Sequence, residues 1–163
     1  MRKTQDPPFI SGMQYKFCQP LTEIEKQRQK KWKQTTTRIV EKETGEKKYG
    51  HRYGMWHFWD SNNNKMAEGS CLPKPPHKRT DHDGSWNYWN EEGLQVKMHW
   101  EHGIINGIWT LYNKENEKIW EFLIKPGEAR KEIFVNEKQL EQYGLRKSYT
   151  NKTSSKQERH HDS

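Results

Sequence analysis

The stretch Gly107-Ile108-Trp109-Thr110-Leu111-Tyr112 decides the fold, because the chain contains its pattern three times. Glycine opens each copy, tryptophan follows two residues later, and an aromatic residue closes the copy five residues after the glycine. The earlier copies are Gly54-Met-Trp56-His-Phe58-Trp59 and Gly84-Ser-Trp86-Asn-Tyr88-Trp89. With 11 Gly and 8 Trp in 163 residues, three such coincidences are not expected by chance. The pattern indicates a structural repeat.

A polar turn and a second strand follow each copy of the repeat. The polar runs begin at Asp60, Asn90 and Asn113. In the second unit, apolar side chains occupy every second position from Leu94 to Trp100, so one face of that strand is apolar and the other is polar. Each unit is therefore predicted to be a β-hairpin in a sheet with one packed face.

Strand alternation divides the recurring positions of the repeat between the two faces of the sheet. The tryptophans that follow the glycines are predicted to pack within the stack rather than to form a ligand-binding stripe: Trp56, Trp86 and Trp109. The closing aromatics fall on the opposite face, where they either contact a partner or are covered by a terminal helix or loop: Trp59, Trp89 and Tyr112. The glycines are predicted to set turns, as the pair Asn106-Gly107 suggests: Gly54, Gly84 and Gly107.

The flanking segments complete a mainly β architecture. Residues 37–49 are expected to form a charged hairpin with its turn at Thr44-Gly45, at the first edge of the sheet. Helix signals occur in residues 21–34, where Thr22 is the expected N-cap, and in residues 136–143. The predicted fold is an elongated antiparallel β-meander of repeated hairpins with short N- and C-terminal helices. Its parts are a basic arm with a short helix (1–36), the repeat domain (37–135), a capping helix (136–145) and a disordered tail (146–163).

Composition agrees with a thin sheet. Hydrophobic residues make up only 29% of the chain and the mean hydropathy is -1.37, whereas aromatic residues reach 12%. The net charge is +7, but Lys+Arg against Asp+Glu is 12 to 6 in residues 1–48, 11 to 12 in 49–135 and 6 to 4 in 136–163. The excess is nearly all terminal, so only the N-terminal arm is predicted to attract phosphate-bearing partners.

Cys18 and Cys71 are the only cysteines, too few for a disulfide framework and not in a metal-binding spacing. They favour a reducing compartment, cytoplasmic or another intracellular one. The first 17 residues contain no apolar run typical of a signal peptide, and no apolar stretch approaches the roughly 20 residues of a membrane span. The expectation is a protein without a transmembrane segment.

The segment from Trp100 to Glu121 resembles a MORN repeat, in particular the tandem variant found in bacterial, phage and protist proteins, including antitoxin-like members. The Gly-Trp-Tyr skeleton carries the resemblance, and the units that begin at Tyr53 and Asp83 share it less fully. The chain departs from the family in a Pro-rich insert at residues 71–83, which is expected to be a loop. The resemblance implies a single-layer sheet of successive hairpins, with protein scaffolding and contact with acidic phospholipids among the roles of members.

The chain lacks the sequence motifs of a catalytic or metal site. There is no Gly-x-Ser-x-Gly elbow, phosphate-binding glycine loop or His-Glu-x-x-His, and Cys71, His77 and His82 do not have the spacing of zinc ligands. We therefore expect no enzyme activity, cofactor or metal. The leading hypothesis is a protein-binding or scaffold module, with the oligomeric state left open. The alternative is binding of nucleic acid or anionic phospholipid by a basic run that otherwise reads as a solvated helix face: Lys26, Arg28, Lys30, Lys31, Lys33 and Arg38.

Overall fold

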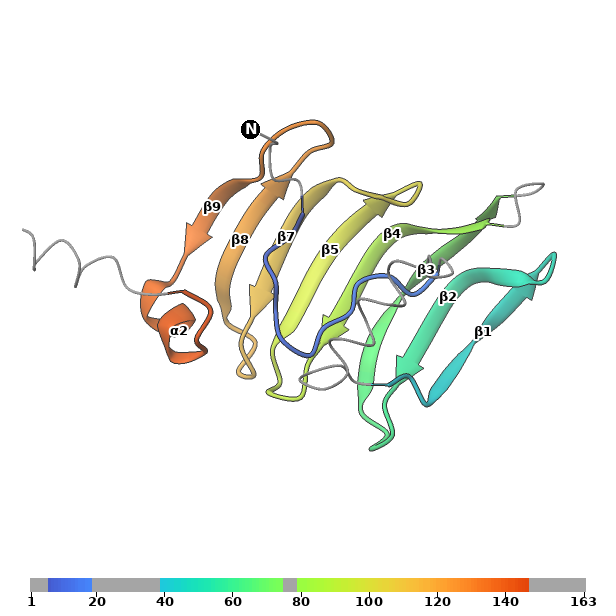
Figure 1. Cartoon of the computed structure of the whole chain (residues 1–163), viewed down its shortest axis with the longest axis horizontal. Coiled ribbons are helices and arrows are strands. Elements are labelled where there is room, and N and C mark those ends of the chain that lie inside the picture. The colour runs from blue at the N-terminus through green and yellow to red at the C-terminus, as the bar shows by residue number, and fades with distance from the viewer. Residues whose placement is uncertain (1–5, 19–38, 75–78, 147–163) are drawn as a thin grey trace, which may run out of the picture.

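One antiparallel sheet dominates the computed structural model, which describes residues 6–18, 39–74 and 79–146 (Figure 1). The sheet has nine strands in the order β1-β2-β3-β4-β5-β7-β8-β9, and β6 pairs with β5. The prediction of a mainly β meander is therefore confirmed. The strands are β1 Lys42–Lys48, β2 His51–Trp59, β3 Lys65–Lys74, β4 Arg79–Trp89, β5 Gln95–Glu101, β6 Ile104–Ile105, β7 Gly107–Tyr112, β8 Lys118–Ile124 and β9 Lys131–Val135.

A short helix, α2, follows the last strand over Glu137–Gln142. Its N-cap is Asn136, whose side chain accepts a hydrogen bond from the backbone N–H of Gln139, as the capping signal in the sequence predicts. Leu140 is its buried residue and packs into the hydrophobic core. The helix predicted at residues 21–34 lies outside the described residues, because residues 19–38 are not among them.

The segment 6–18, which we call the N-terminal strap, runs across one face of the sheet (Figure 1). Because the strap lies against the sheet, its side chains Ile10, Met13 and Phe17 are buried in the core. The rings of Phe17 and Phe58 lie with centroids 4.5 Å apart. We call the sheet face beneath the strap the core face and the opposite one the outer face.

A disulfide joins Cys18, at the end of the strap, to Cys71 in β3. The two cysteines are 53 residues apart in the sequence. The prediction of a reducing compartment rested on the small number of cysteines, and this pairing does not clearly support it. Within the described part of the chain, no helix is long and apolar enough to cross a membrane.

The three polar turns that begin at Asp60, Asn90 and Asn113 occur where the sequence predicts them, whereas two other hairpin turns lie elsewhere. Tyr49-Gly50 joins β1 to β2 and His102-Gly103 joins β5 to β6, and all four residues have positive φ, as a two-residue type I′ turn requires. The predicted turn at Thr44-Gly45 is wrong, because this pair lies within β1 at an irregularity in the register. The right-handed twist of the strands favours a type I′ turn, which needs positive φ at both central residues. A β-branched residue such as Thr44 adopts positive φ only at a high cost.

The repeat glycines lie in strands rather than at the tips of hairpins. Gly54, Gly84 and Gly107 have φ values of 70°, 93° and 125°, but they belong to β2, β4 and β7. They therefore permit a local bend in a strand and do not set turns. The insert at residues 71–83 is likewise mostly not a loop, since β3 extends to Lys74 and β4 begins at Arg79.

Two further glycines make room for the buried indoles. A Cβ on Gly45 would collide with the ring of Trp56, and a Cβ on Gly69 would collide with the ring of Trp86. Each indole therefore lies flat against the backbone of the preceding strand. The indole N–H of Trp56 donates to the carbonyl of Glu46 at 2.8 Å, and that of Trp86 donates to the carbonyl of Ser70 at 2.9 Å.

Candidate functional site

The two sets of repeat aromatics lie on opposite faces of the sheet. Trp56, Trp86 and Trp109 are 3%, 0% and 0% exposed and belong to the core face. The closing aromatics are half-buried and, by strand alternation, lie on the outer face: Trp59, Trp89 and Tyr112. Both placements agree with the division predicted from the repeat.

The closing aromatics form one row across the outer face. Trp59 pairs with Lys42 in β1 and with Lys65 in β3. Farther along, Gln95 in β5 lies between Trp89 in β4 and Tyr112 in β7, and Tyr112 pairs with Lys118 in β8. We call this set the aromatic row: Lys42, Trp59, Lys65, Trp89, Gln95, Tyr112 and Lys118. An aromatic ring recurs on every second strand, and Gln95 lies between the second ring and the third.

Lysine ammonium groups lie over several rings of this face. The Nζ atoms of Lys42 and Lys65 are 4.8 and 5.7 Å from the centroid of the Trp59 ring. The Nζ of Lys97 is 5.3 Å from the Tyr112 ring, and that of Lys118 is 5.1 Å from the Phe134 ring at the sheet edge. Cation–π attraction of this kind holds the amines close to the rings. Aromatic and cationic groups are thus interleaved along the row.

A polar ladder runs parallel to the aromatic row, one step farther along each strand. Glu68 in β3 belongs to it, and its Oε2 is 3.1 Å from both His57 Nδ1 and Lys65 Nζ. In β8, Glu121 accepts a hydrogen bond from Thr110 Oγ1 at 2.9 Å and lies 3.6 Å from Lys118 Nζ. These contacts fix Lys65 and Lys118 beside the rings, so the ladder orients the donors of the row.

Three equivalent turns hold the strand ends that carry the row. The side-chain Oδ1 of Asp60 accepts hydrogen bonds from the backbone N–H groups of Asn62 and Asn64, at 3.0 and 2.9 Å. Asn90 does the same for the N–H groups two and four residues later, and so does Asn113. Sequence reasoning treated these runs only as polar turns. The signal was present, because Asp or Asn follows the closing aromatic in all three units.

The basic run proposed to bind phosphates belongs to a part of the chain that the structure does not describe. Lys26, Arg28, Lys30, Lys31, Lys33 and Arg38 all lie outside the described residues. Their role in nucleic-acid or lipid binding therefore stays a prediction.

The ionisable side chains with strongly shifted pKa values, such as His82 and Tyr88, are buried in the core. His82 is buried between the rings of Trp86 and Trp100, at centroid distances of 4.2 and 4.5 Å. Its Nε2 accepts a hydrogen bond from the backbone N–H of Phe17 at 3.0 Å, and burial lowers the pKa of His82 to about 3. The imidazole is therefore neutral, and it anchors the strap.

Tyr88 forms the second polar contact between strap and sheet. Its hydroxyl donates to the carbonyl of Tyr15 at 3.1 Å and accepts from the indole N–H of Trp100 at 2.8 Å. Burial raises the pKa of Tyr88 well above its usual value of 10. Because the Tyr88 hydroxyl is neutral and already makes two hydrogen bonds, it holds the strap against the sheet and is not available for proton transfer.

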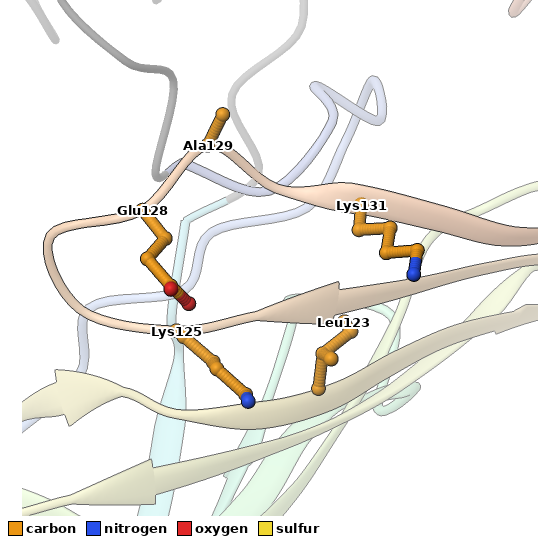
Figure 2. A pocket seen from close by; sticks show the side chains of 5 residues that line it. All are labelled: Leu123, Lys125, Glu128, Ala129 and Lys131. Carbon is orange, nitrogen blue, oxygen red and sulfur yellow. The ribbon is translucent and has the colours of Figure 1, made fainter.

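A pocket of about 340 Å³ lies where the β8–β9 connection folds over the sheet (Figure 2). Its lining consists of Leu123, Lys125, Glu128, Ala129 and Lys131, and Figure 2 shows the two ammonium groups and the carboxylate around one open space. None of these side chains is a nucleophile activated by a base. Among the described residues, no cluster of three or more His, Cys, Asp or Glu side chains is arranged to hold a metal ion.

Comparison with protein-family models, with curated proteins and with solved structures found no match. The resemblance to MORN repeats therefore stays a prediction from the Gly-x-Trp pattern. The case for function depends on the geometry of the outer face.

Proposed function

We propose that this chain is a non-catalytic protein-binding module and that the outer face of its sheet is the contact surface. The observation that carries the proposal is the aromatic row, in which Trp59, Trp89 and Tyr112 occupy equivalent repeat positions on the face opposite the core. Aromatic side chains are enriched at protein interfaces because they supply a large contact area at a low cost in conformational entropy.

The core does not explain why these positions are aromatic. The core face buries its own set of rings beneath the strap, including Trp86 and Trp109. A one-layer sheet needs only one packed face, and polar side chains are the usual occupants of the other. The outer face instead has aromatic rings at three repeat positions, and the exposed Met55 on β2 adds further apolar surface. A surface of this composition is typical of an interaction site.

The ionisable groups of the described residues support a non-catalytic role. His82 and Tyr88 are buried, hydrogen-bonded and remote from the outer face, because they lie on the core face beneath the strap. On the outer face, Glu68 and Glu121 are engaged by neighbouring side chains. Such groups stabilise the sheet and its row.

Panning of a random-peptide display library against the full chain tests the proposal. We expect enriched peptides whose binding is lost with Trp59→Ala or Tyr112→Ala. Each variant has a matched control on the same strand: Tyr53→Ala on β2 and Ile108→Ala on β7, both exposed side chains away from the row. Enriched peptides that bind all four variants equally, or no enrichment at all, would contradict the proposal.

A further inference from the structure

The pocket at the β8–β9 connection is built by a tight turn and by one pair of strand residues. The backbone N–H of Glu128 donates to the carbonyl of Lys125 at 3.2 Å, and Gly127 has a φ of 79°. Proline followed by glycine at positive φ is the pattern of a type II turn, which brings the first and fourth residues close together. On the strands beside the turn, Leu123 in β8 pairs with Lys131 in β9. The backbone therefore fixes the positions from which the lining side chains extend.

The other side of the connection is anchored to the core and the strap. The guanidinium carbon of Arg130 lies 5.0 Å from the centroid of the buried Phe122 ring. Its Nη1 donates to the carbonyl of Asp6 in the strap at 2.8 Å. Because successive side chains of a strand point to opposite faces, the next residue, Lys131, points away from the core and lines the pocket.

Three charged side chains of the pocket are open to solvent. Among the described residues, no hydrogen bond or ion pair engages the side chains of Lys125, Glu128 and Lys131. All three are exposed, and Figure 2 shows their charged ends around one open space. By contrast, the carboxylates of Glu68 and Glu121 in the polar ladder are already engaged by neighbouring side chains. The pocket thus offers two ammonium groups and one carboxylate to a ligand.

This set of charges favours one class of ligand. A simple anion between the two lysines is repelled by Glu128, and a simple cation is repelled by the lysines. An apolar ligand would remove water from three charged groups without replacing it. A molecule with two carboxylates and one ammonium group gives each of the three charges an opposite partner. The pocket volume of about 340 Å³ is near the lower end of the roughly 300–1,000 Å³ typical of ligand sites, so the ligand is small.

We propose that this pocket binds a free α-amino acid with an acidic side chain. The two carboxylates of the ligand pair with Lys125 and Lys131, and its ammonium group pairs with Glu128. Its methylene groups lie against Leu123, the largest apolar side chain of the lining.

The pocket is separate from the aromatic row. Tyr112 of the row pairs with Lys118 at the start of β8, whereas the pocket residue Lys131 pairs with Leu123 near the end of β8. The proposed ligand site therefore goes beyond the protein-binding function, and failure of either leaves the other standing.

Titration of the isotope-labelled full chain at low ionic strength, followed through the chemical shifts of its backbone amides, tests the site. The probes are L-glutamate, glutarate, which lacks the ammonium group, and 4-aminobutyrate, which lacks one carboxylate. We expect L-glutamate to saturate the site in the millimolar range, with shifts concentrated in residues 123–131. Glutarate and 4-aminobutyrate should bind about three- to fivefold more weakly, which is the effect of one exposed ion pair.

Three substitutions separate the contacts. Lys125→Gln and Lys131→Gln should each weaken L-glutamate by about three- to fivefold. Glu128→Gln should weaken L-glutamate but strengthen glutarate, because it removes a carboxylate that repels both probes and attracts only the ammonium group. A loss of folding would weaken both probes, so this reversal reports on the contact itself. The matched control is Lys114→Gln in the exposed turn at the other end of β8, and it should leave both affinities unchanged.

Equal binding of L-glutamate and glutarate overturns the proposal, as does inorganic phosphate that competes as well as L-glutamate, because either result describes a site that recognises negative charge alone. Shifts that Lys114→Gln diminishes as much as Lys125→Gln does would show general ionic screening at the surface and overturn it too. A titration without saturable shifts in residues 123–131 has the same consequence.

Discussion

At the residue scale, His82 shows how one side chain joins the strap to the sheet. Its ring contacts Trp86 and Trp100, and its Nε2 accepts the N–H of Phe17. Acceptance of this hydrogen bond requires an unprotonated Nε2. Because burial lowers the pKa of His82 to about 3, the folded protein keeps that atom unprotonated well into the acid range.

We predict that titration of His82 lowers the free energy of unfolding as the pH falls. The unfolded imidazole has a pKa near 6.5, so below that pH the unfolded state binds a proton that the folded state does not bind until about pH 3. Stability is thus fully present above pH 6.5 and falls as pH drops through this window. From about pH 7.5 to about pH 5, the loss attributable to His82 is about 2 kcal/mol.

Urea unfolding over a pH series, on the wild type and His82→Gln, measures this contribution. The glutamine variant is expected to be less stable at neutral pH, because its side chain packs less well between two indoles. Its stability should nevertheless depend less on pH than that of the wild type. Parallel pH profiles for the two proteins would show that His82 does not titrate in this way.

At the element scale, the three hairpins are made equivalent by their turns rather than by the repeat glycines. Asp60, Asn90 and Asn113 each accept two backbone N–H groups, and these bonds close the turn directly after a closing aromatic. An acceptor oxygen at this position fixes the strand end and therefore the place of the ring. The turns are thus part of the architecture of the aromatic row.

We predict that Asn113→Ala lowers the free energy of unfolding by about 2 kcal/mol, because the N–H groups of Glu115 and Glu117 lose their acceptor. Asn113→Asp should retain most of the stability, since Asp60 performs the same role in the first hairpin. Thermal unfolding of both variants checks the prediction. A comparable loss in the aspartate variant would mean that the Oδ1 contacts are not what stabilises the turn.

At the scale of the whole molecule, the strap completes a core that the sheet cannot form alone. A single-layer sheet exposes both faces, and the strap buries Trp86 and its neighbours on one of them. Its attachments span the sheet, from the disulfide at Cys71 to a hydrogen bond from Arg130 to the carbonyl of Asp6 at 2.8 Å. The outer face lies on the other side and is independent of these contacts.

We predict that loss of the disulfide loosens the strap before it affects the sheet. Cys18→Ser removes a crosslink between residues 53 apart, which corresponds to about 4 kcal/mol of unfolding free energy in the chain-entropy model. Hydrogen exchange should accelerate first in residues 6–18 and in β2 to β4, where the strap is anchored, whereas β7 and β8 keep more of their protection. Uniform acceleration along the chain would contradict this order.

The predicted and observed structures differ where contacts are distant in the sequence. The Gly-x-Trp repeat and the alternation of Leu94 to Trp100 correctly predict a meander of hairpins. The turn at Tyr49-Gly50 was missed because Thr44-Gly45 resembles a turn locally, but Gly45 is needed to accommodate Trp56 on the neighbouring strand. A local pattern does not show which glycine meets a ring on another strand.

The sequence by itself determined the meander of repeated hairpins and the face to which each repeat aromatic belongs. The physical reason is that side chains alternate along any strand, so parity alone separates Trp56 from Trp59. Only the tertiary structure decided the disulfide between Cys18 and Cys71, the burial of His82 and the alignment of the aromatic row. These features depend on strand register and strap docking, which bring together side chains that no local periodicity connects.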